Sequence, residues 1–180
     1  GLRIHGKKQA WVLYPFQPVS GIVRIETRVK VCGDGFALLP ELRNSCGELL
    51  ARVAMYHNNL YVSNGDRWEQ IFDPHGGWFY YPCHNWYEIQ IVADTNTCTY
   101  AVMVDGAKRA DGLPLLSKTD DAAQLGFFTD TDDLLVSSIQ VSDTDTFARH
   151  LLPPGKLYDV TQAPYCAAGD GRTLDTEAIQ

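Results

Sequence analysis

The chain has 180 residues, of which 45% are hydrophobic and 21% are charged, so it can bury one sizeable core as a globular domain. Its formal net charge of −7 argues against a general nucleic-acid binder, which needs a basic face for phosphates. No apolar run approaches the roughly 18 to 20 residues that a membrane-spanning helix requires. We therefore expect neither nucleic acid nor a membrane among its partners.

The beginning of the chain predicts an arm over residues 1–10 and a first strand over 11–14. Pro15 and Pro18 should interrupt this strand, because proline cannot donate to a strand ladder. A long strand is expected over 21–32, where residue types alternate with a period of two. One face should lie in the core and the other in water. The core set is Val23, Ile25, Thr27, Val29 and Val31, and the solvent set is Arg24, Glu26, Arg28 and Lys30.

The next segments predict short strands separated by turns. Residues 36–39 form an apolar run that Pro40 should stop, and 41–47 are polar and typical of a loop. The tripeptide His57-Asn58-Asn59 indicates the turn of a hairpin. Further strands are expected over 49–56, 60–63 and 68–72. No sustained 3.6-residue period occurs before residue 145, so we expect no long helix there.

The clearest pattern lies between Trp86 and Gly106. Ile89, Ile91 and Ala93 alternate with polar or less apolar residues, and residues 99–104 alternate in the same way. The small polar turn between the two runs predicts an antiparallel hairpin, with Asp105-Gly106 making the next tight turn. We expect Trp86 in the core. Many short strands with frequent turn signals are typical of a β-sandwich.

These residues carry a resemblance to a known family. A tryptophan, two aliphatic residues three and five positions later, an aspartate, a short turn and a strand ending in Val104-Asp105-Gly106 resemble the concanavalin A-like (laminin-G-like) β-sandwich family. Residues 124–129 and 134–141 resemble the closing strands of that family. The resemblance implies an all-β fold, a two-sheet antiparallel jelly-roll sandwich over residues 1–150. It says little about activity, because many functions occur on this fold.

Residues 73–85 form an aromatic-rich loop between turn residues. One interpretation is a sugar-stacking platform, because the apolar face of a sugar packs on an aromatic ring. The alternative is that these rings pack into the sandwich or cover its edge. Under the first interpretation the candidate carbohydrate-binding residues are Trp78, Tyr80, Tyr81, Trp68, His84 and Asn85.

Metal binding is considered at two places. Cys83 and His84 could ligate a metal together with His75, but adjacent residues rarely chelate one ion, so we assign no metal site. Seven aspartates occur between Lys118 and Arg149, at positions 120, 121, 130, 132, 133, 143 and 145. Clustered carboxylates suit calcium, although no EF-hand spacing is present and solvated loop aspartates are common. Calcium therefore stays an open hypothesis, and no other cofactor is expected.

Five cysteines are scattered at positions 32, 46, 83, 98 and 166, and none forms a Cys-x-x-Cys pair. This spacing argues against a zinc ribbon. An odd count without a dense framework favours reduced thiols and a cytoplasmic location. An extracellular protein with one or two disulfides stays open, so the sequence leaves the compartment undecided.

The alternating strand pattern gives way to a different sequence pattern over residues 151–180. A linker over 151–155 is followed by a strand, a Gly-Asp-Gly turn and a helix start, which resemble the opening of polygalacturonase-type right-handed β-helix proteins. The matching residues are Tyr158, Asp159, Val160, Gly169, Asp170, Gly171, Thr173, Asp175, Thr176, Ala178, Ile179 and Gln180. Residues 163–166 depart from the family pattern, so polygalacturonases are not separated from related β-helix lyases and hydrolases. The resemblance implies that the sandwich precedes a β-helix catalytic domain.

Three functions are weighed. The first is an accessory carbohydrate-binding module of a pectin-degrading glycoside hydrolase, with a plant polysaccharide such as galacturonan as partner. Arg24, Arg28 and Lys30 could then supply a basic strip for an anionic sugar. The second is a purely structural or oligomerisation domain. The third is a glycosidase in its own right, which is disfavoured because no Glu-x-Asp-x-x-Glu spacing exists and Glu88 and Asp94 are the nearest substitute. No catalytic residue is assigned.

Overall fold

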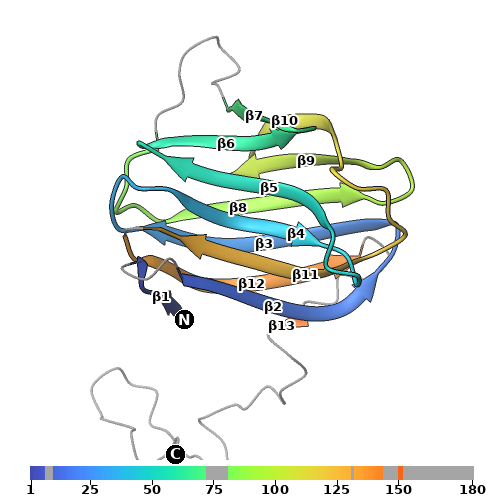
Figure 1. Ribbon diagram of the computed structural model, residues 1–180, viewed down its shortest axis with the longest axis horizontal. Coiled ribbons are helices and arrows are strands. Elements are labelled where there is room, and N and C mark those ends of the chain that lie inside the picture. The colour runs from blue at the N-terminus through green and yellow to red at the C-terminus, as the bar shows by residue number, and fades with distance from the viewer. Residues whose placement is uncertain (7–9, 72–80, 131, 144–149, 152–180) are drawn as a thin grey trace, which may run out of the picture.

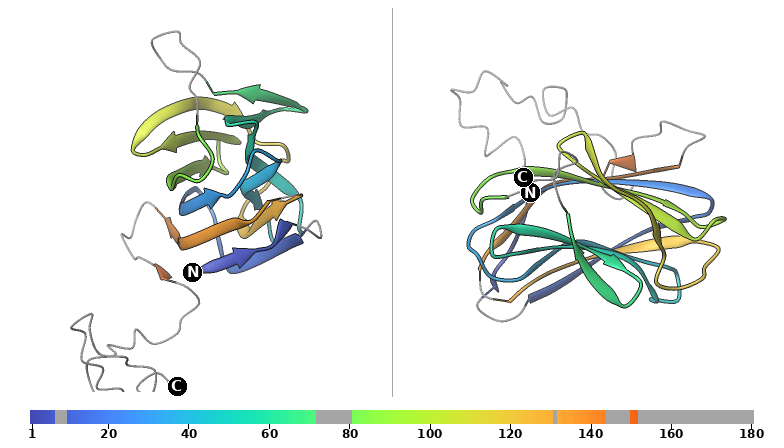
Figure 2. Two further views of the ribbon diagram at one scale, coloured as in Figure 1. Left: turned by 90° about the vertical axis from the view of Figure 1, so that its left-hand side faces the viewer. Right: turned by 90° about the horizontal axis from the view of Figure 1, so that it is seen from above.

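The computed structural model describes residues 1–6, 10–71, 81–130, 132–143 and 150–151. This part of the chain folds into two antiparallel sheets that stack face to face (Figures 1 and 2). It contains no α-helix, and thus no helix that could cross a membrane. The expected all-β, two-sheet antiparallel sandwich is confirmed.

Sheet A has seven strands, and the first and last described strands lie at the same edge. β1 and β13 both pair with β12, next to each other along that strand. The order across the sheet is β1 (Leu2–Ile4), β12 (Leu134–Asp143), β3 (Ile22–Val31), β8 (Tyr87–Asp94), β9 (Thr99–Val104) and β10 (Ala107–Pro114), with β13 (His150–Leu151) beside β12.

Sheet B has six strands and ends in a hairpin at one edge and a long strand at the other. Its order is β2 (Ala10–Val19), β11 (Ala122–Thr129), β4 (Ala37–Arg43), β5 (Leu49–Tyr56), β6 (Asn59–Asn64) and β7 (Arg67–Gln70). β5, β6 and β7 form a meander through two tight turns. The turn residues His57 and Asn58 have φ values of 47° and 60°, which two-residue hairpin turns require.

The core lies between the sheets and is built by alternation. Every second residue of β3 points inward, as the sequence predicts, and residues 23, 25, 27, 29 and 31 are at most 1% exposed. The β8–β9 hairpin is also confirmed, with Ile91 opposite Val102 and both fully buried. Asp105 and Gly106 have φ values of 49° and 77°, so they form the predicted turn.

Two predictions about prolines are wrong. β2 continues through Pro15 and Pro18, because it is an edge strand with a partner on one side only. β4 continues through Pro40 to Arg43, where a loop was expected. The pairing of β4 with β5 shifts between Leu38 and Glu41, so Pro40 lies in an irregularity of the ladder where its missing donor is tolerated.

The expectation that Trp86 lies in the core is also wrong, since 38% of this residue is exposed. The period of two explains the error. Tyr87, Ile89 and Ile91 point inward, so Trp86 shares the outer face with Glu88. There the guanidinium of Arg28 lies 5.4 Å from the Trp86 ring centroid.

The expected boundary after residue 150 falls at the end of the described part. His150 and Leu151 pair with Val141 and Gln140 of β12. Residues 152–180, which carry the β-helix resemblance, lie outside the described residues.

Candidate functional site

The outer face of sheet B is defined by the register of its strands. Gly126 of β11 lies opposite Leu13 of β2 and opposite Glu41 of β4. The neighbouring Leu125 and Phe127 are fully buried, so Gly126 points away from the core. Residues in register with Gly126 therefore face outward. Two positions along, Phe128 lies opposite Trp11 in the same way.

Five aromatic side chains from separate segments of the chain gather on this face, and we call them the aromatic row. Phe128 lies 4.9 Å from Trp11 and 6.2 Å from Phe36, measured between ring centroids. Phe36 in turn lies 6.1 Å from Trp68 and 6.5 Å from Tyr56. Trp11, Tyr56 and Trp68 are 51%, 43% and 39% exposed. The row thus crosses sheet B from β2 to β7 and presents ring surface to solvent.

Hydrogen bonds hold the central ring in place. The backbone amide of Phe36 donates to Oδ1 of Asp130 at 3.0 Å, and that of Gly35 donates to Oδ2 of Asp132 at 3.2 Å. The loop before β4 is thereby tied to the loop after β11. Two of the aspartates considered as calcium ligands therefore bind backbone amides beneath the aromatic row.

A group of charged side chains lies next to the row. Oε1 of Glu41 accepts a hydrogen bond from Nε of Arg43 at 2.6 Å, and Glu41 is only 2% exposed although it belongs to the outer face. Arg52 lies opposite Glu41 on β5, and its guanidinium carbon is 4.6 Å from the ring centroid of Trp68. One face of Trp68 is therefore covered by a cation, which is attracted by the ring's negative face.

Two buried hydroxyls support this region from the core. The Tyr100 hydroxyl of β9 reaches across the sandwich, donates to the backbone oxygen of Ser63 and lies 2.9 Å from Ser63 Oγ. Burial raises the pKa of Tyr100 to about 12, so the phenol stays protonated at neutral pH. Ser63 Oγ also accepts from the backbone amide of Arg52 at 3.1 Å. This network holds β5, which carries Arg52, against β6, the strand that pairs with Trp68 of β7.

Of the six predicted carbohydrate-binding residues, the structure places only Trp68 in the aromatic row. Trp78 and Tyr80 lie outside the described residues. His84 and Asn85 are exposed, and His84 donates its backbone amide to the Val31 oxygen of β3 at 2.7 Å. They therefore stand by sheet A.

Tyr81 packs into the sandwich, which is the alternative to sugar stacking that the sequence left open. Its side chain is fully buried and packs edge-on against Tyr87, with ring centroids 5.4 Å apart. Burial raises the pKa of its hydroxyl, while Arg109 opposes that rise. The backbone amide of Tyr81 donates to the Asn58 oxygen at 2.7 Å, so this segment adjoins the β5–β6 turn. Tyr81 thus acts as a core residue and offers no ring face to a ligand.

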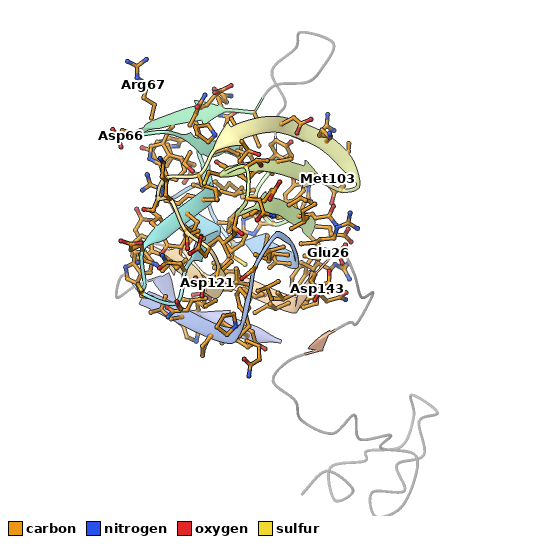
Figure 3. All side chains as sticks on the ribbon, turned by 90° about the vertical axis from the view of Figure 1, so that its right-hand side faces the viewer. Glu26, Asp66, Arg67, Met103, Asp121 and Asp143 are labelled. Carbon is orange, nitrogen blue, oxygen red and sulfur yellow. The ribbon has the colours of Figure 1, made fainter. Side chains whose placement is uncertain are left out.

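The basic strip predicted on β3 lies on the opposite side of the sandwich. Arg24, Arg28 and Lys30 alternate with buried residues of β3 and so belong to the outer face of sheet A. Glu26 lies among them and accepts from Nε2 of Gln90 at 2.5 Å. Figure 3 separates the two faces: Asp66 and Arg67 project from the β6–β7 turn of sheet B, whereas Glu26 and Met103 lie on the side of sheet A. The strip cannot serve a ligand bound to the aromatic row.

The described aspartates do not converge on one point. Asp133 pairs with Arg3 and His5, and Asp121 accepts from the Ser45 backbone amide at 3.2 Å. Asp121 and Asp143 lie far apart in Figure 3. Among the described residues, no group of three or more His, Cys, Asp or Glu side chains could hold a metal ion. The four described cysteines, at positions 32, 46, 83 and 98, are free thiols.

Glu88 and Asp94 do not form a glycosidase pair. They stand at opposite ends of β8, and six strand residues at about 3.3 Å each separate them by about 20 Å. Glycosidase carboxyl groups are about 5 to 9.5 Å apart. Asp94 instead accepts hydrogen bonds from the Thr97 hydroxyl and from the Asn96 amide, both at 2.9 Å, which lower its pKa. It is a turn residue.

Sequence reasoning missed most of the aromatic row, because its members come from five separate segments. One signal was present. In Phe127-Phe128 the alternation allows only one ring to enter the core, so the other must face outward. The same argument applies to Trp11 and Leu13, which share a face on β2 and are more than half exposed.

The comparisons with known proteins concern the fold. No family model and no curated protein matches the sequence. Solved structures do match. A sialidase aligns with a TM-score of 0.66 and 12% identity over 79% of this chain and 15% of its own. A tetrameric galectin from Cinachyrella sp. (ball sponge) aligns with a TM-score of 0.53 and 14% identity over 74% of this chain and 100% of its own.

An alginate lyase, AlgAT5 from polysaccharide lyase family 7, aligns with a TM-score of 0.51 and 15% identity over 68% of this chain and 59% of its own. The chain therefore spans less than two thirds of the sialidase and of this lyase. At these identities the likeness shows the fold alone. The chain is a two-sheet jelly-roll sandwich, and the sialidase, the galectin and the alginate lyase share this architecture.

Proposed function

We propose that this domain is a carbohydrate-binding module and that its binding surface is the aromatic row on sheet B. The observation that carries the proposal is the row itself. Trp11, Tyr56 and Trp68 keep 39% to 51% of their surface exposed while their neighbours Phe128 and Phe36 link them into one band. Exposed aromatic surface of this kind, next to polar groups, suits the apolar faces and hydroxyls of sugars.

The shape of the row favours an extended glycan. The rings follow one another at 4.9 to 6.2 Å from Trp11 to Trp68 and cross several strands of sheet B. A single sugar would use one ring, whereas a chain of sugars could contact several in succession. An oligosaccharide is therefore the expected ligand. Trp78, Tyr80, His84 and Asn85 stay predicted carbohydrate contacts from the sequence, but His84 and Asn85 stand by sheet A and are not assigned to the ligand of the aromatic row.

The biological context of the proposal comes from the sequence. The β-helix resemblance of residues 158–180 supports an accessory role next to a pectin-degrading, polygalacturonase-like glycoside hydrolase domain. Under this proposal the sandwich holds the enzyme on a plant polysaccharide such as galacturonan, and the catalytic residues belong to the β-helix domain.

The test is isothermal titration of the 180-residue chain with oligogalacturonates and with neutral plant oligosaccharides. Trp68→Ala should lower the affinity for the glycan that binds by about tenfold or more, since one stacking contact is lost. Trp86→Ala is the matched control, because Trp86 is exposed to the same degree, 38% against 39%, but lies on sheet A. It should bind as the unmodified chain does. Absence of heat with every glycan would overturn the proposal.

A second candidate function is an oligomerisation domain, which the exposed residues Trp11 and Leu13 on the edge strand β2 favour. Edge strands with apolar side chains pair readily with other strands. Sedimentation velocity over a range of concentrations tests this candidate. This candidate is supported over carbohydrate binding if two results are found together. The chain forms a dimer that Leu13→Lys dissociates, and it binds no glycan.

A further inference from the structure

Arg52 stands beside Trp68, one of the two exposed tryptophans of the aromatic row. Its guanidinium carbon lies 4.6 Å from the centroid of Trp68, and Arg52 itself is half-buried. The backbone amide of Arg52 is tied to Ser63, which the buried Tyr100 hydroxyl holds in turn. The cation therefore has a fixed place beside a ring surface.

Among the described residues, no carboxylate forms an ion pair with this cation. Glu41 lies directly opposite Arg52 in the pairing of β4 with β5, but its carboxylate binds Arg43 at 2.6 Å. Among the described residues the Arg52 side chain donates no hydrogen bond, and its Nε atom is buried without any acceptor. Because Nε is buried, a ligand would meet this guanidinium at its terminal Nη atoms, where a charged acceptor gains a charge-assisted hydrogen bond.

The charges around Arg52 define what that acceptor should be. Glu41 and Arg43 pair with each other, so among the described residues Arg52 is left without an ion-pair partner beside Trp68. A guanidinium presents several N–H groups in one plane, a geometry that matches the two oxygens of a carboxylate. Neutral hydroxyls would satisfy the donors but would not neutralise the charge.

We infer that the ligand of the aromatic row is an acidic glycan whose sugar carboxylate binds Arg52 while the adjoining sugar ring packs on the row. The inference rests on the proposed carbohydrate-binding function. It makes Arg52 the residue that determines specificity, and it names uronic-acid polymers as the ligand class. The basic residues of β3, which the sequence suggested for this role, lie on the other sheet.

The test compares two forms of one glycan on one protein. Oligogalacturonates and their carboxyl-reduced counterparts are titrated calorimetrically into the 180-residue chain and into Arg52→Gln. The acidic form should bind the unmodified chain at least about tenfold more tightly than the reduced form, because a charge-assisted bidentate contact is lost on reduction. Arg52→Gln should abolish this difference, because it should lower the affinity for the acidic form about tenfold more than the affinity for the reduced form.

Two controls keep the result specific. Arg24→Gln removes one positive charge from the outer face of sheet A and should keep the preference for the acidic form. Arg52→Lys should recover part of it, since the charge is restored without the planar fork. Thermal unfolding confirms that each variant is folded.

The outcomes separate the two proposals. Equal affinity for acidic and reduced glycans, or an equal loss of both on Arg52→Gln, would overturn the role of Arg52 and leave glycan binding standing. Failure of both forms while a neutral oligosaccharide binds would overturn the acidic-ligand inference alone, and failure of every glycan would overturn the proposed function itself. Poly-glutamate is titrated as well, and binding as tight as that of the acidic glycan would mean that the site recognises acidic polypeptides.

Discussion

A β-carbon placed on Gly126 would lie 2.7 Å from Cγ of Glu41 and 2.8 Å from its Oε1 atom. The two residues face each other on neighbouring strands of sheet B, and the Glu41 side chain occupies the space that a larger residue would fill. This explains how Glu41 is 2% exposed on an outer face. Glycine is required at position 126 for close approach and not for its backbone conformation.

Gly126→Ala should therefore lower the free energy of unfolding by about 1–3 kcal/mol, because the added methyl group displaces Glu41 from its bond with Arg43. Chemical denaturation measures the change. If displacement of Glu41 is the cause, the same substitution should cost much less in a Glu41→Ala background. Equal costs in both backgrounds would contradict this explanation.

Arg43→Met should be strongly destabilising, because it leaves the nearly buried Glu41 carboxylate without its partner. Removing one member of a buried ion pair costs about 3–5 kcal/mol, and the lower end applies here since Arg43 is 28% exposed. The double variant Glu41→Gln, Arg43→Met should recover part of the loss. A double variant as unstable as the single one would show that Arg43 matters through contacts other than Glu41, such as its Nη1 hydrogen bond to the Gly47 oxygen at 2.7 Å.

Tyr100→Phe should cost about 1–2 kcal/mol at neutral pH, since the buried hydroxyl loses its bonds to Ser63. It should also change the alkaline stability. Burial raises the pKa of Tyr100 from 10.0 to about 12, so between these values the unfolded chain releases a proton that the folded chain keeps. The free energy of unfolding then falls as pH rises. Denaturation curves across this range should be less steep in pH for the variant, and an identical dependence would contradict the assignment.

Trp86→Ala tests the outward placement of this tryptophan. With 38% of the residue exposed and Arg28 stacked on its ring, we expect a loss of about 1–2 kcal/mol. Ile91→Ala in the same strand should lose about 3–4 kcal/mol, because Ile91 is fully buried. Chemical denaturation measures the free energy of unfolding of both variants. A larger loss for Trp86 than for Ile91 would place Trp86 back in the core.

Much of the fold follows from local patterns. Alternation fixed the inward residues of β3, β8 and β9, since a period of two leaves one choice once a single residue is known to be buried. The errors at Pro15, Pro40 and Trp86 share one origin. A proline is tolerated at a sheet edge or at an irregularity of the strand pairing, and whether a tryptophan faces the core depends on which alternate residues of its strand point inward. These features depend on how the strands pair, which the local sequence does not show.

The binding face could be predicted only in part. Trp68 was recognised from its residue type, but Phe36, Phe128 and Trp11 were not, although they lie beside it. Their positions in the chain differ by up to 117 residues between Trp11 and Phe128, and no local pattern connects such distant segments. Tyr81, in contrast, had the right residue type and an uncertain strand parity, and the structure buries it.

The sequence by itself determined the class of fold and the composition of each strand's two faces, because hydrophobic burial acts on alternation within a strand. The tertiary structure decided which outer residues meet. Strand order in sheet B brings Trp11, Phe128, Phe36 and Trp68 into one row, and register sets Arg52 opposite a glutamate that Arg43 already holds. Pairing between strands is a long-range choice made by the whole core, so the charge left beside Trp68 becomes visible only once the sheets have formed.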